Sequence, residues 1–335
     1  MALILAPMVR GSFPAMRTYC LQNEADYVYT DVIMAKALIQ SEKRETDHCI
    51  EFTRTNQKVL LIVKQEKSKT IIQLAGTDFD DLNAAALLVK DYCLRVDLNL
   101  GCAKHFTSQC GAGGVLGTQG TLAADLLKKL STNAPWSVKT RLRDTFEEAL
   151  QHILDLLNAN VQFIAIHCRK FNEDREKTRA RWDEFFDIYE ALNQEQRKKI
   201  IFNGGLINEN DYFRLKTVFE KKQLPLTPVL LARGAIRDPE IFRKIKLNQI
   251  SSTVHSYRIY QEIGIISKHN NYKFCDYKAC VMFSLKWIRD LSQGMGEGVR
   301  DKAINAIQEI AHHKSYDQII EFLKHNIENG KLDEK

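Results

Sequence analysis

The sequence predicts an α/β protein, a TIM (β/α)8 barrel followed by a C-terminal all-α helical bundle. Short apolar runs alternate with longer amphipathic segments eight times, and the apolar runs stop beyond Lys246. Eight strand–helix units in about 240 residues is the usual size of such a barrel. A doubly wound open sheet is the alternative, but its first turn is normally glycine-rich, and Pro7–Ser12 holds no GxGxxG pattern. We therefore expect the barrel over residues 1–245 and the bundle over residues 246–335.

Each expected strand is a short apolar run, and helical patterns such as Asp78–Tyr92 and Asp144–Leu157 follow. Around the turn-like segment 55–57, apolar and polar residues alternate, which indicates a hairpin inserted at about residues 50–65. In the bundle, Tyr277–Leu291 and Val299–Ile310 are typical of amphipathic helices. The expected strands are Leu3–Ala6, Tyr27–Thr30, Thr70–Leu74, Arg95–Asn99, Trp136–Lys139, Gln162–His167, Lys199–Asn203 and Pro228–Ala232.

Composition and cysteine usage restrict the class of protein. The chain has 335 residues, of which 44% are hydrophobic and 27% charged, so disorder is excluded as the main state. The apolar runs fall far below the roughly 20 residues of a membrane-spanning helix, and the N-terminus has no basic leader. The eight cysteines form no CxxC pair and no zinc-ligand spacing, which favours a reducing compartment. We expect a cytoplasmic protein with no membrane segment and no metal.

The charge distribution permits a polyanionic partner. The net charge is +6, from 48 basic and 42 acidic residues. The segment from Lys246 to Asp290 carries seven Lys or Arg against three Asp or Glu, whereas the rest of the tail is nearly balanced. This local excess is where a nucleic acid would be expected to bind.

Two loops after the last strands of the barrel predict a phosphate site. In a TIM barrel the reacting groups lie at the carboxyl ends of the strands, and a phosphate commonly binds after strands 7 and 8. Asn203-Gly204-Gly205 and Ala232-Arg233-Gly234 stand at these places. Glycines allow backbone N–H groups to face an anion, and Arg233 supplies a positive charge. The alternative is a tight turn beside a surface arginine.

Three further strand-end residues suggest a bound ring system. Lys139 would face the barrel mouth, where it needs a negative partner such as a reduced flavin, a phosphate or a Schiff-base substrate. His167 would hydrogen-bond the same ring, act as a base or serve the fold. Gln73 offers both a donor and an acceptor, which matches the imide edge of a flavin.

Cys102 follows the fourth strand and precedes a glycine-rich stretch at residues 110–114. A thiol with the ordinary pKa near 8.5 is mostly protonated at neutral pH and suited to donating a proton. Lys104 and His105 nearby would instead favour the thiolate. We interpret Cys102 as an acid or a nucleophile, and we interpret as small buried hydrophobes Cys20, Cys93, Cys168 and Cys280.

Taken in order, these residues resemble the tRNA-dihydrouridine synthase family, most of all the eukaryotic cytoplasmic enzymes that act at position 20 of the tRNA D-loop. No single segment is specific to the family, but the ordered set of segments, with Gly101-Cys102 after the fourth strand, is a fairly strong signal. The resemblance covers nearly the whole chain. Its segments are Leu5–Arg10, Met16-Arg17, Ala25–Tyr29, Gln73–Asp78, Asp97–Lys104, Lys139–Arg141, Ile166–Lys170, Asn203–Gly205, Ala232–Ala235, Pro239 and Ile241-Phe242.

The resemblance implies an FMN-dependent barrel, a helical domain that binds tRNA, and NADPH as the reductant. A hydride would pass from the flavin to C6 of uracil while Cys102 gives a proton to C5. We expect a monomer. The implied uracil or RNA contacts are Asn99, Lys104 and Arg169. The implied FMN contacts are Pro7, Met8, Val9, Gln73, Lys139, His167, Asn203, Gly204, Gly205, Ala232 and Arg233.

The chain departs from the family pattern in the loop that carries the thiol. The family has Gly-Cys-Pro and then Ser-x-Lys-Gly-Gly-Met-Gly; the Pro, Ser, Lys, first Gly and Met positions here are Ala103, Thr107, Gln109, Cys110 and Ala112. Two other functions therefore stay open. One is a small-molecule FMN pyrimidine oxidoreductase in which Cys102 is a base. The other is a catalytically weakened family member that binds tRNA or FMN without turnover.

Overall fold

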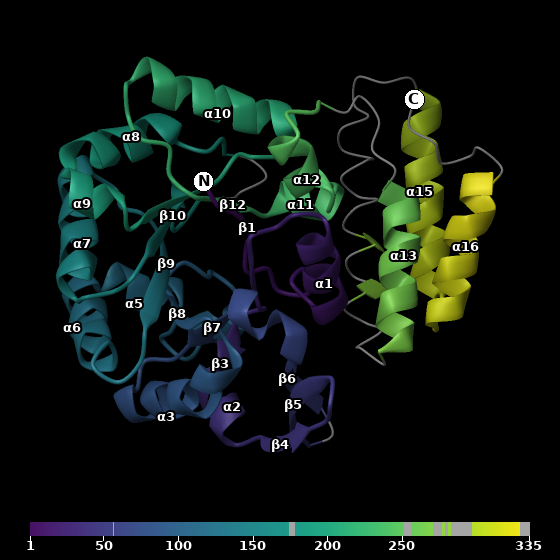
Figure 1. The fold of residues 1–335 in the computed structure, drawn as a ribbon, viewed down its shortest axis with the longest axis horizontal. Helices are drawn as coiled ribbons and strands as arrows, with labels where there is room; N and C mark the ends of the chain where they lie inside the picture. The colour runs from purple at the N-terminus through teal and green to yellow at the C-terminus, as the bar shows by residue number, and fades with distance from the viewer. Residues whose placement is uncertain are drawn as a thin grey trace.

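The computed structural model describes residues 1–55, 57–173, 178–250, 256–270, 277–278, 281–282 and 297–328. Eight parallel strands form a closed barrel (Figure 1), because β2 pairs with β7 as well as with β1. Closure rules out the open sheet, and all eight predicted strands are confirmed to within three residues at each end. They are β1 (Leu3–Leu5), β2 (Tyr27–Tyr29), β7 (Thr70–Ala75), β8 (Arg95–Asn99), β9 (Trp136–Leu142), β10 (Ile164–Lys170), β11 (Ile200–Asn203) and β12 (Val229–Leu231).

The barrel interior has an apolar part and a polar part. Alternate residues of each strand point inward. From most strands they form a small apolar cluster, separate from the main core between strands and helices; it includes Ile4, Tyr29, Ile71, Ala165, Ile201 and Leu230. On β8 and β9 the paired inward positions Asp97 and Ser137 are polar and buried. A polar group inside a barrel must be hydrogen-bonded there, so β8 and β9 are where function is expected.

Helices cover the outside of the barrel, and the sequence explains where they begin. The predicted helix 78–92 is α3 (Phe79–Val89) with a short 3-10 turn after it, and Asp78 caps it by accepting from the backbone N–H of Asp81. Thr145 and Glu148 form a capping box at the start of α7 (Phe146–Asn158). The other covering helices are α1 (Pro14–Gln22), α2 (Ala35–Ile39), α6 (Gly120–Leu130), α8 (Trp182–Ala191), α9 (Gln194–Arg197), α10 (Glu209–Lys221) and α12 (Ile241–Lys246).

A small antiparallel sheet is inserted after α2. It consists of β4 (Glu42–Glu45), β5 (Cys49–Arg54) and β6 (Gln57–Val63). The buried Arg17 of α1 donates a 2.7 Å hydrogen bond to the Leu61 carbonyl oxygen, which ties the sheet to the barrel. A further two-residue strand, β3 (Ile33–Met34), lies beside β7.

Helices follow the last strand. The short α11 (Arg233–Arg237) and α12 complete the barrel, and α13 (Ser256–His269) packs against α1 and α16 (Tyr316–Glu328). The predicted helix 299–310 lies within α15 (Glu297–His312), at the side of the barrel in Figure 1. The predicted helix 277–291 lies outside the described residues except at four positions. No helix within the described ranges has both the length and the apolarity that crossing a bilayer would require.

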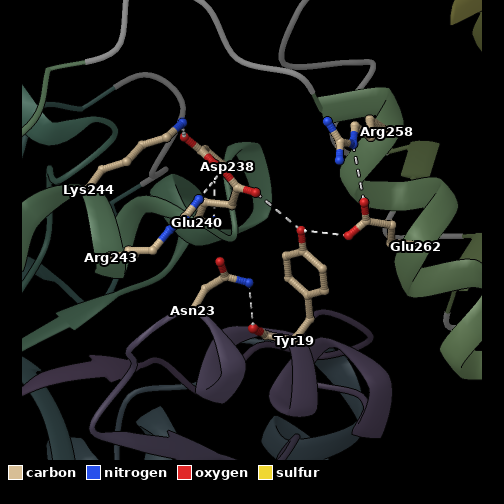
Figure 2. Close-up of polar contacts among 8 residues, drawn as sticks. All are labelled: Tyr19, Asn23, Asp238, Glu240, Arg243, Lys244, Arg258 and Glu262. Atoms are coloured by element: carbon tan, nitrogen blue, oxygen red, sulfur yellow. Dashed lines mark hydrogen bonds and ion pairs between the residues drawn. The ribbon is translucent and has the colours of Figure 1, made fainter.

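Tyr19 of α1 connects the barrel to the C-terminal helices (Figure 2). Its hydroxyl lies 3.3 Å from Oε1 of Glu240 and 3.2 Å from Oε2 of Glu262 on α13. Burial and the two carboxylates raise the pKa of Tyr19, so the hydroxyl keeps its proton. Lys246, the last residue of α12, lies 2.7 Å from Oδ1 of Asp26 and holds α12 on the barrel. The C-terminal helices are therefore fixed to this side of the barrel.

His152 of α7 makes the fold sensitive to acid. Its ring nitrogens lie 3.0 Å from Oγ1 of Thr140 and 3.1 Å from Nη2 of Arg143. Burial and the Arg143 charge lower the pKa of His152 to about 3. Between pH 6.5 and 3 the unfolded chain therefore binds a proton that the folded chain does not, and the free energy of unfolding rises with pH.

We expect His152→Gln to reduce this dependence, because glutamine keeps both hydrogen bonds and does not titrate. Between pH 7 and pH 5 the wild type should lose about 2 kcal/mol more stability than the variant. Urea unfolding at the two pH values measures the difference. Equal losses in the two proteins would contradict the assignment.

Candidate active site

The carboxyl ends of β7 to β11 place polar side chains at one end of the barrel. The strand register aligns Asn99 with Lys139 and His167 with Asn203. Because side chains alternate across a strand, these four residues and Gln73 of β7 share the inward orientation. The structure thereby brings together five of the residues that the sequence predicts for a site.

Lys139 lies in the mouth of the barrel. Removal from water lowers its pKa to about 8, and the Arg141 guanidinium acts in the same direction. The Asp97 carboxylate and the nearby thiols of Cys102 and Cys168 oppose this shift. Lys139 therefore remains mostly protonated at neutral pH, within electrostatic reach of the Cys102 thiol.

His167 is surrounded by cations. Burial lowers its pKa well below the ordinary value, and Lys139, Arg141, Arg169 and Arg233 each lower it further. Nη1 of Arg169 lies 3.2 Å from Nε2 of His167, so the neutral imidazole accepts this hydrogen bond. Four positive side chains around a neutral ring create a strongly positive field at the mouth, which favours an anionic ligand.

The loop after β11 requires glycine. Gly204 and Gly205 have φ angles of 131° and 77°, in the region that L side chains rarely adopt. The Trp182 indole N–H donates a 3.0 Å hydrogen bond to the Gly204 carbonyl oxygen and fixes the turn. The Asn203 side chain donates to the Leu230 carbonyl oxygen at 3.0 Å. Asn203 thus joins β11 to β12 directly before the glycine turn.

The two loops predicted to share a phosphate are in contact. Ala232 follows β12 and precedes α11, which begins at Arg233. A Cβ added to Gly234 would lie 3.0 Å from the Leu206 carbonyl oxygen and 3.2 Å from that of Ile207. The absence of a side chain at Gly234 therefore allows α11 to pack onto the segment that follows Gly205.

The backbone around Cys102 is held from several sides. Oδ1 of Asn99 accepts from the N–H groups of Gly101 and Cys102, at 3.1 and 2.8 Å. Nε of Arg141 donates to the Gly101 carbonyl oxygen at 2.7 Å, and the N–H of Gly114 donates to that of Cys102 at 2.8 Å. Cys102 is half-buried. The thiol thus sits on a fixed loop at the edge of the cationic mouth.

The Gln73 and Asn99 amides bind each other. Nδ2 of Asn99 donates to Oε1 of Gln73 at 2.7 Å, and Nε2 of Gln73 donates to Oδ2 of Asp97 at 2.8 Å. Both amides were predicted to contact ligands, whereas these hydrogen bonds run within the protein. Each amide keeps one further N–H for a ligand.

The remaining predicted residues lie around the rim. The loop of Pro7, Met8 and Val9 is closed by Ser12, whose Oγ accepts from the Met8 N–H at 2.7 Å, and Val9 is 38% exposed. Arg169 is buried and donates from Nε to the Thr178 carbonyl oxygen at 2.9 Å. The Lys104 side chain is exposed, next to Cys102.

Sequence reasoning missed two residues of the site, Asp97 and Arg141. Both lie two positions from a predicted residue on the same strand, Asp97 before Asn99 and Arg141 after Lys139. The period of two residues along a strand was the signal that could have found them.

Comparison with known proteins gives one family. Residues 4–320 match the family described as Dihydrouridine synthase (Dus). A tRNA-dihydrouridine(20) synthase [NAD(P)+] of Saccharomyces cerevisiae is 31% identical over 259 residues, covering 72% of this chain and 66% of that protein. A protein of the same name in Schizosaccharomyces pombe is 28% identical over 308 residues, covering 86% of this chain and 61% of that protein.

Other similarities are more distant. A tRNA-dihydrouridine(16/17) synthase [NAD(P)(+)] of Saccharomyces cerevisiae is 28% identical over 244 residues, 71% of this chain and 53% of that protein. The chain thus spans between about half and two thirds of the length of these three relatives. A solved structure of DHODH from Eimeria tenella aligns with 79% of this chain and 82% of that one, with a TM-score of 0.45 and 14% identity.

Proposed function

The chain belongs to the dihydrouridine synthase family, and we propose that it is a flavin-dependent oxidoreductase that reduces uridine in tRNA to 5,6-dihydrouridine. One observation carries this proposal most directly: the half-buried Cys102 stands on a loop held by hydrogen bonds, within electrostatic reach of Lys139 at the barrel mouth. The cations suit an anionic cofactor, and the thiol suits a proton donor.

We propose FMN as the cofactor and NADPH as its reductant. FMN carries a phosphate, and its ring becomes anionic on reduction, so the positive field around His167 fits both parts. The Gly204-Gly205 backbone, Ala232 and Arg233 would hold the phosphate. Lys139, His167 and Gln73 would face the ring, with Asn203 shaping the turn and Pro7, Met8 and Val9 closing the rim. When bound and reduced, FMN supplies the hydride that goes to C6 of uracil.

Cys102 is the catalytic residue of the proposed reaction. Its thiol gives a proton to C5 of uracil, which balances the hydride added at C6 and saturates the C5–C6 double bond. Asn99 and Arg141 hold the loop so that the sulfur keeps its place during this transfer. Asn99, Arg169 and Lys104 would bind the uracil or the neighbouring RNA. The uracil must leave its stack to enter the mouth.

We propose that residues 246–335 bind the tRNA, that residues 1–245 are the catalytic domain, and that position 20 of the D-loop is the target. Two relatives are named for that position, and the segment from Lys246 to Asp290 carries the local excess of basic residues. A cytoplasmic monomer, without metal, is the form we propose.

Anaerobic turnover tests this function. We expect the purified protein to be yellow with one flavin per chain, and NADPH-reduced protein to be reoxidised by unmodified tRNA with dihydrouridine mapped to position 20. Reoxidation by a free pyrimidine alone would indicate the small-molecule enzyme instead. Colourless protein that shifts tRNA in a gel would indicate a family member without turnover.

A further inference from the structure

Asp97 is a buried carboxylate that the proposed reaction does not use. Its Oδ1 accepts from Oγ of Ser137 at 2.7 Å, and its Oδ2 accepts from Nε2 of Gln73 at 2.8 Å. From Gln73 the hydrogen bonds continue through Asn99 to the backbone of Cys102. We propose that Asp97 is a positioning residue, which orients the Gln73 and Asn99 amides in one direction and thereby fixes the loop that carries Cys102.

The direction follows from the chemistry of each group. An ionised carboxylate only accepts, so Gln73 must turn its NH2 toward Asp97 and its carbonyl toward Asn99. Asn99 must then turn its NH2 toward Gln73, and its carbonyl oxygen is left facing the two backbone N–H groups of Gly101 and Cys102. With either amide reversed, donors would face donors. The carboxylate at one end and the two backbone N–H groups at the other therefore hold the Asn99 carbonyl in the same orientation.

Burial makes this orientation matter. Asp97, Gln73 and Asn99 are 0%, 1% and 7% exposed, so water does not readily replace a lost partner. Burial raises the pKa of Asp97 to about 6, while the hydrogen bonds from Gln73 and Ser137 and the charges of Lys139 and Arg95 oppose the rise. The carboxylate is thus mostly ionised at neutral pH.

The chain of hydrogen bonds ends on one peptide group. Asn99 accepts from the N–H of Cys102, and Arg141 donates to the carbonyl oxygen of Gly101, so the peptide between these residues is held at both of its polar atoms. A Cβ at Gly101 would lie 3.3 Å from Cγ of Arg141, which leaves little room for a side chain there. The position of the Cys102 Cα is thereby fixed relative to β8 and β9.

A pair of variants separates the direction of these hydrogen bonds from the burial of the residues that make them. In Asp97→Asn, the new amide can donate to Oε1 of Gln73. This would reverse the direction of the hydrogen bonds between the side chains. In the double variant Asp97→Asn/Gln73→Glu, the carboxylate stands at residue 73. There it accepts from Nδ2 of Asn99, as Oε1 of Gln73 does in the wild type, which restores the original direction. Thr140→Val is the matched control, because it removes a different buried hydrogen bond, 3.0 Å to His152.

The readout is alkylation of Cys102 by iodoacetamide in the full-length protein, followed by peptide mass spectrometry with Cys49 as the internal reference. We expect Asp97→Asn to raise the rate about fivefold, the factor that corresponds to losing one hydrogen bond. The double variant and Thr140→Val should stay within about twofold of the wild type. Dihydrouridine formation should fall in Asp97→Asn.

Alkylation of Cys102 in Asp97→Asn at the wild-type rate would overturn the proposal. So would a double variant whose Cys102 is alkylated as fast as that of Asp97→Asn. If Asp97→Asn does not fold, Gln73→Met interrupts the same chain and should show the same rise; an unchanged rate in Gln73→Met would overturn the proposal as well. The catalytic meaning of this inference rests on the proposed function. The alkylation rate is measured without tRNA, so it tests the positioning role independently of that function. A wild type that forms no dihydrouridine would therefore refute the function alone.

Discussion

Replacing Cys102 with alanine should lower the rate of dihydrouridine formation by a factor of about 10² to 10⁴, the range that general acids contribute. The mouth, its cations and the flavin contacts remain, so flavin content and reduction by NADPH should match the wild type. Single-turnover mixing of pre-reduced protein with unmodified tRNA, followed by flavin absorbance and dihydrouridine mapping, separates the two half-reactions.

Two further variants sharpen this test. Cys102→Ser keeps the size of the side chain but replaces the thiol with a far weaker acid, so it should be nearly as slow as alanine. Cys110→Ala removes an exposed thiol from the same loop and should retain activity. Full activity in Cys102→Ala, or equal losses in Cys102→Ala and Cys110→Ala, would remove the acid assignment.

Arg233→Ala should weaken flavin binding by a factor of about 10 to 100, because a charge-assisted hydrogen bond to a phosphate contributes roughly 1.5 to 3 kcal/mol. Arg233 begins α11 beside the glycine loop after β11, where the cofactor phosphate is proposed. Flavin per chain after gel filtration and fluorescence titration of flavin-free protein both measure the loss.

Arg237→Ala is the matched control for Arg233. It lies at the other end of α11 and removes the same charge from the chain. If general electrostatic attraction held the flavin, the two variants would lose affinity equally. Unchanged retention in Arg233→Ala would refute its role at the phosphate.

The barrel could be predicted because most of its strands are apolar runs, and seven of the eight end in polar, glycine or proline residues. The strands that escaped prediction lack such a run. All four residues of β4, Glu42–Glu45, are exposed and charged, and the strand is held by backbone pairing to β5. β3 has two residues, too few for any periodicity.

The sequence predicted which positions form the site. It did not predict which groups the side-chain amides of the site bind. The strand-end rule selected Gln73 and Asn99, but which group each amide binds depends on the register that places Gln73 beside Asp97 across β7 and β8. Register is set by the closed barrel and does not follow from local sequence. The same reason explains Asn203, whose amide reaches across to β12.

Tyr19 has a consequence for recognition. Its hydroxyl lies within hydrogen-bond distance of Glu240, beside α12, and of Glu262 on α13, so it links α1 to the first of the C-terminal helices. Under the proposed function, a tRNA would contact both the C-terminal helices and the barrel mouth. Under that function, only a uridine at the matching distance along the RNA would reach the thiol, and any bending would fall on the nucleic acid.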